Sequence, residues 1–252
     1  MSAPPAPAPR EASGLATPSD RPPEGPAAAD PSAFLRIVTH DLHGPIAAVR
    51  TMVEVLARGH VGPLQPRQAE VVERIERRLA SLQALVDDLV DLASVRAGAG
   101  EARVVVDLGA AVRDACTSIE AAGVGTAALN LCLASEPLPV AVKPGDLGLL
   151  LDHLLSNAVK YGAGRDVHVT VEALGRQARV LVADAGIGIP EDAVPHLFQP
   201  FFRAPNAAAA GAGSGLGLVI AKEAVERCGG TIDIESVEGA GTRVVVRLPL
   251  AQ

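Results

Sequence analysis

The chain has 252 residues, 48% apolar residue types and a formal net charge of −7 at pH 7. The apolar content suffices for a buried core, whereas the acidic balance excludes an obvious nucleic acid-binding or membrane-binding surface. The three cysteines, Cys116, Cys132 and Cys228, lie far apart without a C-x-x-C pair, which argues against a disulfide framework and favours a reducing compartment.

The first segment, residues 1–30, contains eight prolines and eight alanines. Proline blocks helices and alanine buries little area, so this composition predicts a disordered tail. The segment lacks the apolar stretch of a signal peptide. The longest uncharged window, residues 204–221, contains Pro205 and four glycines. This composition suits a loop better than a lipid-exposed helix. We therefore expect a cytoplasmic protein without a membrane segment.

Residues 31–98 have the pattern of an antiparallel helical hairpin. The first helix, 31–58, begins after the capping segment at Asp30 and ends at the glycines and prolines of 59–66. The second helix runs to about Val95. Its apolar residues recur at alternating steps of three and four, which is a heptad seam: Val72, Ile75, Leu79, Leu82, Val86 and Leu89. A lone hairpin cannot cover this seam, so we expect a homodimer that forms a four-helix bundle. The alternative is a hairpin that packs only on its own C-terminal domain.

Residues 99–252 follow a joint of small residues at 97–100. Their apolar residues recur with helical spacing in some segments and alternate as in strands in others. Together with the hairpin they predict an α+β protein whose second domain is an α/β two-layer sandwich with mainly antiparallel strands. The expected helices are 110–122, 145–161, 191–198 and 216–228, and the expected strands are 130–134, 167–172, 179–184, 231–236 and 242–248.

Two glycine clusters in this domain indicate an anion site. One, 184–190, follows a strand, and the other, 211–217, precedes a helix, where backbone N–H groups can approach a phosphate. Neither fits a P-loop or G-x-G-x-x-G spacing, so either alone could be a flexible turn. The carboxylate of Asp184 can accept the exocyclic amine of a base. Asn157 and Lys160 share a helix face, where an amide oxygen suits magnesium and an ammonium suits phosphate.

The arrangement of these motifs resembles the catalytic core of a bacterial sensor histidine kinase. The similarity runs from about Phe34 to Pro249 and rests on segments that stand in the family's order: the N box at Asn157–Tyr161, the first glycine box at Asp184–Pro190, the F box at Phe198–Arg203, the second glycine box at Gly213–Leu218, and G-x-G-T at Gly239–Thr242. The resemblance implies an ATP-dependent protein-histidine autokinase that needs Mg²⁺ and passes its phosphoryl group to a response-regulator receiver domain.

The resemblance also implies roles for individual residues. His40 would be the phosphorylated nucleophile and Asp41 would accept a hydrogen bond from its ring. Pro45 removes the N–H that would bond the Asp41 carbonyl, which loosens this turn. The nucleotide ligands would be Asn157, with magnesium, Lys160, Tyr161, Asp184, Gly186, Gly188, Gly213, Gly215, Leu216, Gly217 and Thr242.

Three positions depart from the family's pattern. His43 stands where Lys or Arg is usual, Gly44 where Thr or Asn is frequent, and His153 replaces the first Asn of the N box. Two alternative functions remain open. One is a non-catalytic phosphotransfer or scaffold dimer with a degenerate ATP domain, which the His153 substitution favours. The other is a gyrase- or chaperone-like ATPase, which would leave His40 unexplained.

Overall fold

The computed structural model describes residues 31–97, 102–123, 127–209 and 213–251, with side chains for all of these except residues 31–40 and 208–209. The predicted tail, residues 1–30, lies outside these ranges, as does most of the predicted joint at 97–100. Within the described ranges no helix is long and apolar enough to cross a membrane.

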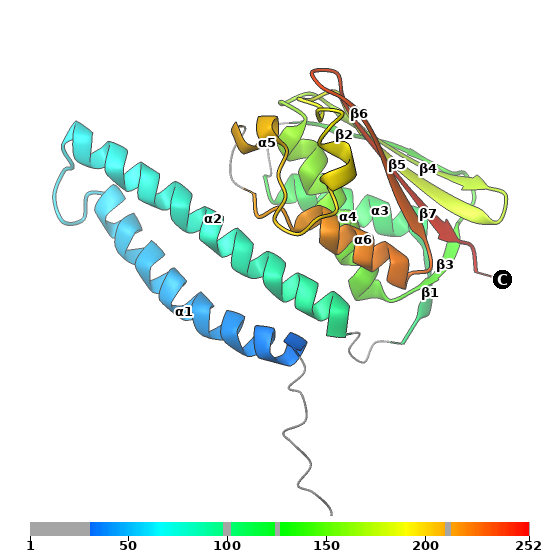
Figure 1. Cartoon of the computed structure of the whole chain (residues 1–252), viewed down its shortest axis with the longest axis horizontal. Coiled ribbons are helices and arrows are strands. Elements are labelled where there is room, and N and C mark those ends of the chain that lie inside the picture. Colours follow the sequence, from blue (N-terminus) through cyan, green and yellow to red (C-terminus); the bar gives the residue numbers. More distant parts are fainter. Residues whose placement is uncertain (1–30, 98–101, 124–126, 210–212, 252) are drawn as a thin grey trace, which may run out of the picture.

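The N-terminal part is an antiparallel helical hairpin, as predicted (Figure 1). It consists of α1 (Pro31–Ala57) and α2 (Pro66–Ala97). Each helix begins at a proline. Proline lacks a backbone N–H, but N–H groups in the first turn have no acceptor within the helix, so nothing is lost there. The connection contains Gly59 and Gly62 at positive φ angles of 71° and 116°, a conformation that favours glycine. The helix α1 continues past Pro45 without interruption.

The C-terminal part is built on a five-stranded sheet with the strand order β2-β4-β5-β7-β6. Its strands are β2 (Leu129–Leu133), β4 (Val167–Leu174), β5 (Gln177–Asp184), β6 (Thr231–Val237) and β7 (Gly241–Pro249). The pair β2–β4 is parallel and the other pairs are antiparallel. Side chains alternate between a buried and a more exposed face in β4 and β5, as a sheet covered on one side requires.

Helices α3 (Leu108–Ala121), α4 (Pro144–Tyr161) and α6 (Gly217–Arg227) cover one face of this sheet (Figure 1). The central helix α4 packs between α3, α6 and β5, and eight of its 18 residues are buried. The result is the expected two-layer α/β sandwich. Its core also includes Leu92 and Val95, so the C-terminal end of α2 belongs to the packing of the second domain.

Several short elements differ from the sequence-based expectations. The predicted helix 191–198 is wrong: only a 3-10 turn, η1 (Val194–His196), forms there, because Pro195 removes a helical N–H in the middle of the segment. Three elements were not predicted. They are the strands β1 (Val104–Asp107) and β3 (Pro139–Val142), which pair with each other, and the short helix α5 (Pro205–Ala209).

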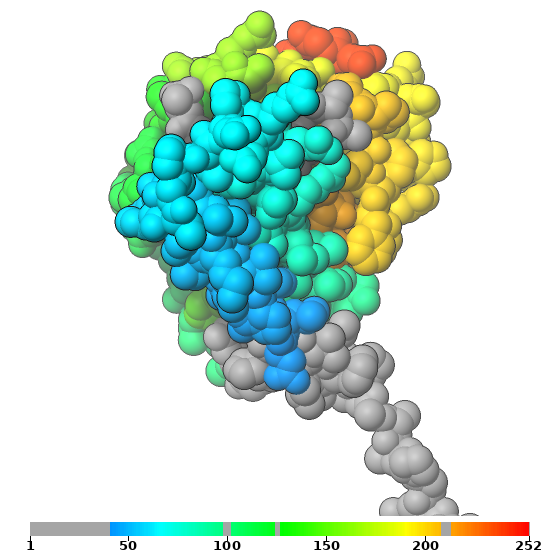
Figure 2. Space-filling view, turned by 90° about the vertical axis from the view of Figure 1, so that its left-hand side faces the viewer, coloured from blue at the N-terminus to red at the C-terminus, as the bar shows by residue number. Residues whose placement is uncertain are grey.

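The hairpin lies against the second domain through α2 (Figure 1). Figure 2 views the molecule from the hairpin side and shows α1 and the first half of α2 on the outer surface. The apolar residues of the two helices divide accordingly. Of the six seam residues of α2, Val72 and Val86 are buried, Leu79 and Leu89 are half-buried, and Ile75 and Leu82 are exposed. On α1, Ile46 and Val53 are buried, whereas Leu42, Val49 and Leu56 are exposed. The single chain thus leaves part of the apolar surface of the hairpin uncovered.

Candidate functional site: a nucleotide pocket bordered by the helical hairpin

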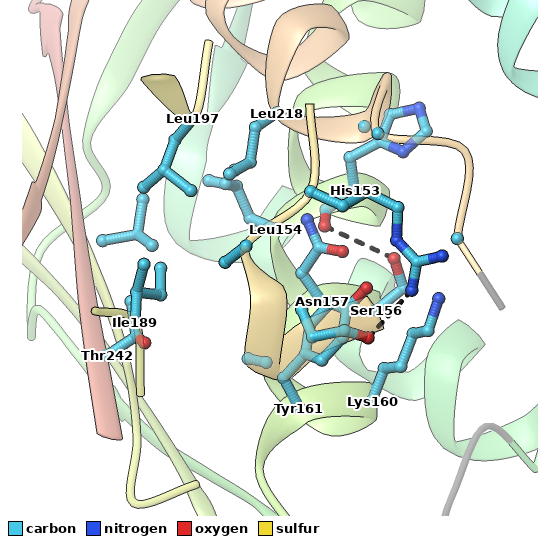
Figure 3. Close-up of a pocket in the computed structure, with 18 of the residues that line it drawn as sticks. His153, Leu154, Ser156, Asn157, Lys160, Tyr161, Ile189, Leu197, Leu218 and Thr242 are labelled. Carbon is cyan, nitrogen blue, oxygen red and sulfur yellow. Dashed lines mark hydrogen bonds between the residues drawn. The ribbon is translucent and has the colours of Figure 1, made fainter. Parts of the chain in front are cut away.

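The second domain contains a pocket of about 310 Å³ between α4, the ends of β5 and β7, and the segment that leads into α6. Figure 3 shows that the pocket has two chemically different ends. Polar side chains of α4 lie at one end, and apolar residues with Thr242 lie at the other. A ligand with a polar and a flat apolar part would fit such a pocket.

The helix α4 supplies the polar end because its residues repeat with helical spacing. His153, Asn157 and Lys160 follow one another at steps of four and three and line the pocket, so they share one face. The opposite positions carry Leu147, Leu151 and Leu155, which are buried in the core. Burial of the apolar face therefore fixes the direction in which the three polar side chains point.

The glycines before α6 bring its N-terminal backbone close to these side chains. A Cβ atom built on Gly213 would lie 3.0 Å from Lys160 Nζ and 3.1 Å from Tyr161 Oη. A Cβ atom on Gly217 would lie 3.2 Å from His153 Nδ1 and 3.7 Å from Asn157 Nδ2. An ammonium group and the start of a helix thus lie side by side, and both attract anions.

Asp184 marks the other end of the pocket, where β5 stops. Its Oδ1 accepts a hydrogen bond from the backbone N–H of Gly186 at 2.9 Å. Burial raises the pKa of Asp184, while hydrogen bonds from the backbone N–H groups of Gly186 and Thr242 act in the opposite direction. Gly186 is required here because a Cβ atom would lie 1.9 Å from the carbonyl oxygen of Tyr161.

The apolar surroundings of Asp184 suit a planar ring. Ile189, Leu197 and Leu218 line this end and Thr242 stands beside them (Figure 3). The hydroxyl of Thr242 lies 2.8 Å from Ser236 Oγ. A carboxylate amid aliphatic side chains can accept one directional hydrogen bond from a bound ring, and that bond distinguishes an amine from a carbonyl.

The helix α2 borders the same pocket from outside the domain. Ala84 and Asp88 line it, and Ser214 Oγ donates a hydrogen bond to Asp88 Oδ2. Burial raises the pKa of Asp88, and the Ser214 hydrogen bond opposes this. Further along, Arg96 Nε and Nη2 donate to the carboxylate of Glu223 on α6 at 2.6–3.0 Å. The hairpin therefore contacts the segment that leads into α6 at the polar end.

The predicted phosphoacceptor residues lie on α1, away from the pocket lining. His40 belongs to the helical part of α1, and Asp41 is exposed. The neighbouring His43 places Nε2 2.8 Å from Asp87 Oδ1 on α2. That contact holds the ring of His43 against the other helix of the hairpin.

The pocket brings together nine of the residues predicted as nucleotide ligands: Asn157, Lys160, Tyr161, Asp184, Gly188, Gly213, Gly215, Gly217 and Thr242. The two remaining residues, Gly186 and Leu216, do not line it. Gly186 packs against the backbone of Tyr161, and Leu216 is fully buried at the start of α6.

Sequence reasoning missed the apolar end of the pocket and the contribution of α2. Ile189 and Leu218 stand inside the two glycine boxes, so their position next to the glycines was a usable signal. Asp88 gave no such signal, since its contact with Ser214 joins positions 126 residues apart.

This combination defines a class of protein: a helical hairpin attached to a two-layer α/β domain with a nucleotide-type pocket. Comparison with known families agrees. Residues 32–98 match the His Kinase A (phospho-acceptor) domain, and residues 142–252 match the histidine kinase-, DNA gyrase B- and HSP90-like ATPase domain. The chain belongs to the histidine kinases and contains both parts of their catalytic core.

Curated relatives carry the same assignment. The chain is 32% identical over 225 residues to the signal transduction histidine-protein kinase AfsQ2 of Streptomyces coelicolor, covering 86% of this chain and 41% of the relative. It is also 32% identical over 231 residues to the histidine protein kinase DivJ of Caulobacter vibrioides, covering 88% and 38%. The chain thus spans about two fifths of the length of these relatives.

Solved structures share the fold. Full-length ShkA in complex with AMPPNP superposes with a TM-score of 0.64 and 24% identity, covering 88% of this chain and 46% of that one. The Acinetobacter baumannii histidine kinase AdeS superposes with a TM-score of 0.56 and 20% identity, covering 84% and 98%.

Proposed function

We propose that this chain is an ATP-dependent protein-histidine autokinase of a two-component signalling system. It phosphorylates His40 and transfers the phosphoryl group to an aspartate of a response-regulator receiver domain. The observation that carries the proposal is the two-ended pocket, in which Lys160 and the glycines before α6 face one end and Asp184 the other. This division matches the phosphates and the base of ATP.

Different residues of the pocket bind different parts of ATP. The carboxylate of Asp184 accepts the exocyclic amine of adenine, with Thr242, Gly186 and Gly188 shaping the site around it. Lys160 and the backbone between Gly213 and Gly217, with Leu216 anchoring the helix start, hold the phosphates. Tyr161 closes the side of the pocket against Gly213. These contacts fix the orientation of the triphosphate, which is the main task of a phosphoryl-transfer site.

The donor set also fits Mg²⁺. Asn157 points into the polar end (Figure 3), and its amide oxygen is a hard ligand of the kind magnesium prefers. Magnesium sites of nucleotide enzymes use one or two protein ligands and complete the shell with phosphate oxygens and water. The bound ion supplies charge neutralisation to the phosphates, and Asn157 holds its position.

His40 is the nucleophile in this proposal. One ring nitrogen forms a bond to the γ-phosphorus of ATP, the bond from that phosphorus to the β–γ bridging oxygen breaks, and ADP leaves. Asp41 accepts a hydrogen bond from the other ring nitrogen. The rival acceptor is His43, whose Nε2 lies 2.8 Å from Asp87 Oδ1 on α2. The phosphoryl group then passes from His40 to the receiver carboxylate.

The reaction requires a rearrangement or a second subunit. The helix α2 lies between α1 and the ATP-binding domain (Figure 1). The γ-phosphate reaches His40 only after the domain leaves α2, or by acting on the partner's hairpin. We propose that the chain forms a homodimer with a four-helix bundle, because the exposed leucines and valines of the hairpin need a cover.

The domain division follows from the same reasoning: residues 1–30 as a tail, 31–98 as the dimerisation and phosphotransfer hairpin, and 99–252 as the ATP-binding domain. We place the chain in the cytoplasm because ATP and receiver domains are available there. The three described cysteines are free thiols, in keeping with that compartment.

A non-catalytic phosphotransfer scaffold is the second candidate. Two observations favour it: His153 replaces the first Asn of the N box, and the Asp88 carboxylate lies at the polar end of the pocket. In that case the hairpin would accept phosphate from another kinase, and ATP would not label the purified protein.

Incubation of the purified chain with γ-labelled ATP tests the proposal. We expect acid-labile label on the wild type and none on His40→Gln, while His40→Gln still binds ATP because the nucleotide lies in the other domain. His60→Gln, in the exposed hairpin loop, is the matched control and keeps its label. Wild-type labelling of His40→Gln contradicts the assignment, and absent labelling of all three supports the scaffold.

A further inference from the structure

Three ligating side chains meet where α2 touches the ATP-binding domain. Asp88 and Asp91 come from α2 and His153 from α4. One ligand atom of each lies within 4.8 Å of the other two, and all three residues are partly buried. This is the one such cluster among the residues that the structure describes. The proposed function does not use it.

The ring of His153 lacks the partner that its burial calls for. Its side chain is 14% exposed, and its Nε2 is buried without a hydrogen bond to any described residue. The Oδ2 atom of Asp91 faces it at 3.5 Å, longer than a normal hydrogen bond. A buried polar atom without a hydrogen bond lowers the stability of the folded protein. A cation between the ring and the carboxylate would give both groups a partner.

We propose that Asp88, Asp91 and His153 form a binding site for a divalent transition-metal ion of the zinc type, which fastens α2 to the ATP-binding domain. An imidazole nitrogen with two carboxylates suits such ions, whereas magnesium prefers oxygen ligands alone. Ligand atoms around tetrahedral zinc are separated by roughly 3–3.5 Å, given metal–ligand distances of about 2.0–2.2 Å. Closing by at most about 1–2 Å would complete the site, with water in the fourth position.

The site exists because of one departure from the family's N box. A His at position 153 supplies the only nitrogen ligand of the cluster, and the usual Asn would not. Gly217, at the start of α6, leaves room for the ring of His153 in this orientation. A Cβ atom on Gly217 would lie 3.2 Å from His153 Nδ1. The metal site is therefore a property of this chain, and it uses ligands other than Asn157.

An ion at this place would inhibit the kinase. Asp88 and His153 also line the nucleotide pocket, so the ion would hold α2 across its polar end and resist the domain movement that brings the γ-phosphate to His40. This consequence rests on the proposed autokinase function, whereas metal binding itself does not.

Metal binding is tested on the full chain without ATP or magnesium. After treatment with a chelator, zinc is titrated calorimetrically and cobalt is followed by visible absorption. We expect one site per chain and a tetrahedral cobalt spectrum. The variants Asp91→Asn and His153→Asn should weaken zinc binding at least tenfold. The matched controls Asp114→Asn, His60→Asn and Cys132→Ser change exposed residues and should bind as the wild type. Equal affinity in the wild type and Asp91→Asn would overturn the site.

The inhibitory role is tested by adding zinc to the autophosphorylation reaction in excess magnesium. We expect zinc to reduce labelling of the wild type at least fivefold and to leave Asp91→Asn unaffected, with Asp114→Asn inhibited like the wild type. Equal inhibition of Asp91→Asn would refute the inhibitory clamp. If zinc binds as expected but no variant labels even without zinc, the autokinase proposal fails and the metal site stands.

Discussion

The two parts of the chain differ in how completely they bury their apolar side chains. In the ATP-binding domain, α4 buries eight of 18 residues between a sheet and two helices. In the hairpin, α2 buries five of 32, and three of these, Leu92, Ala93 and Val95, lie at the end that joins the second domain. The ATP-binding domain buries its apolar side chains within its own chain, whereas the hairpin leaves part of its apolar face exposed to solvent.

This difference separates two sources of stability. The sandwich can rely on its own core, whereas in the proposed homodimer a second copy would cover Leu42, Val49 and Leu82 on the outer part of the hairpin. In the proposed kinase, this division would let the dimer bundle stay fixed while the closed domain moves from α2 towards His40.

The strongest disruption is expected from a charge in the proposed dimer seam. Leu82→Asp would place a carboxylate in the bundle interior, which costs about 3 kcal/mol or more and raises the dimer dissociation constant at least 100-fold. Light scattering after size-exclusion chromatography should show a monomer at micromolar concentration. Ser94→Asp, on an exposed position of the same helix, should stay dimeric. A dimeric Leu82→Asp would mean that this face is not the interface.

A cavity in the closed domain should lower stability by an amount that does not depend on protein concentration. Leu155 is fully buried in α4, so Leu155→Ala should lower the unfolding free energy by about 2–5 kcal/mol. Urea denaturation at two protein concentrations measures this. If the loss varied with concentration, the domain would depend on the dimer, and the contrast between the two parts would be wrong.

Within the pocket, the two ends should respond differently. Asp184→Asn removes the charged acceptor and should weaken ATP binding by about 1–3 kcal/mol, with or without magnesium. Asn157→Ala should impair magnesium-dependent phosphorylation more than nucleotide affinity. Calorimetry and labelling rates, each with and without magnesium, distinguish the two. Identical effects of both variants would contradict the division into a base end and a phosphate end.

The smallest effect on stability is expected at Gly44. A Cβ atom there meets nothing within 4 Å, so Gly44→Thr should fit and stabilise α1 by about 0.3–0.5 kcal/mol. In similar kinases a hydroxyl or amide at this position places the water that hydrolyses the receiver phosphate. We therefore expect slow receiver dephosphorylation by the wild type, faster dephosphorylation by Gly44→Thr, and unchanged autophosphorylation. Rapid decay with the wild type would assign the water to another residue.

The sequence predicted those features that depend on local patterns. The two long helices, α4, α6 and the five strands of the main sheet follow periodicity and end at glycines or prolines, and the glycine boxes located the pocket. Contacts between segments far apart in the sequence leave no local pattern, so the features that depend on them were not predicted. The strands β1 and β3 have four residues each and pair with one another across more than 30 residues of sequence, and Asp88 enters the pocket through the docking of α2.

Phosphopeptide mapping tests the central claim most directly. The wild-type chain is labelled with ATP and magnesium, digested at neutral pH, and fragmented by mass spectrometry so that His40 and His43 are distinguished. We predict that the phosphoryl group is found on His40. Phosphate on His43, three residues further along the same helix, would contradict the account of the nucleophile.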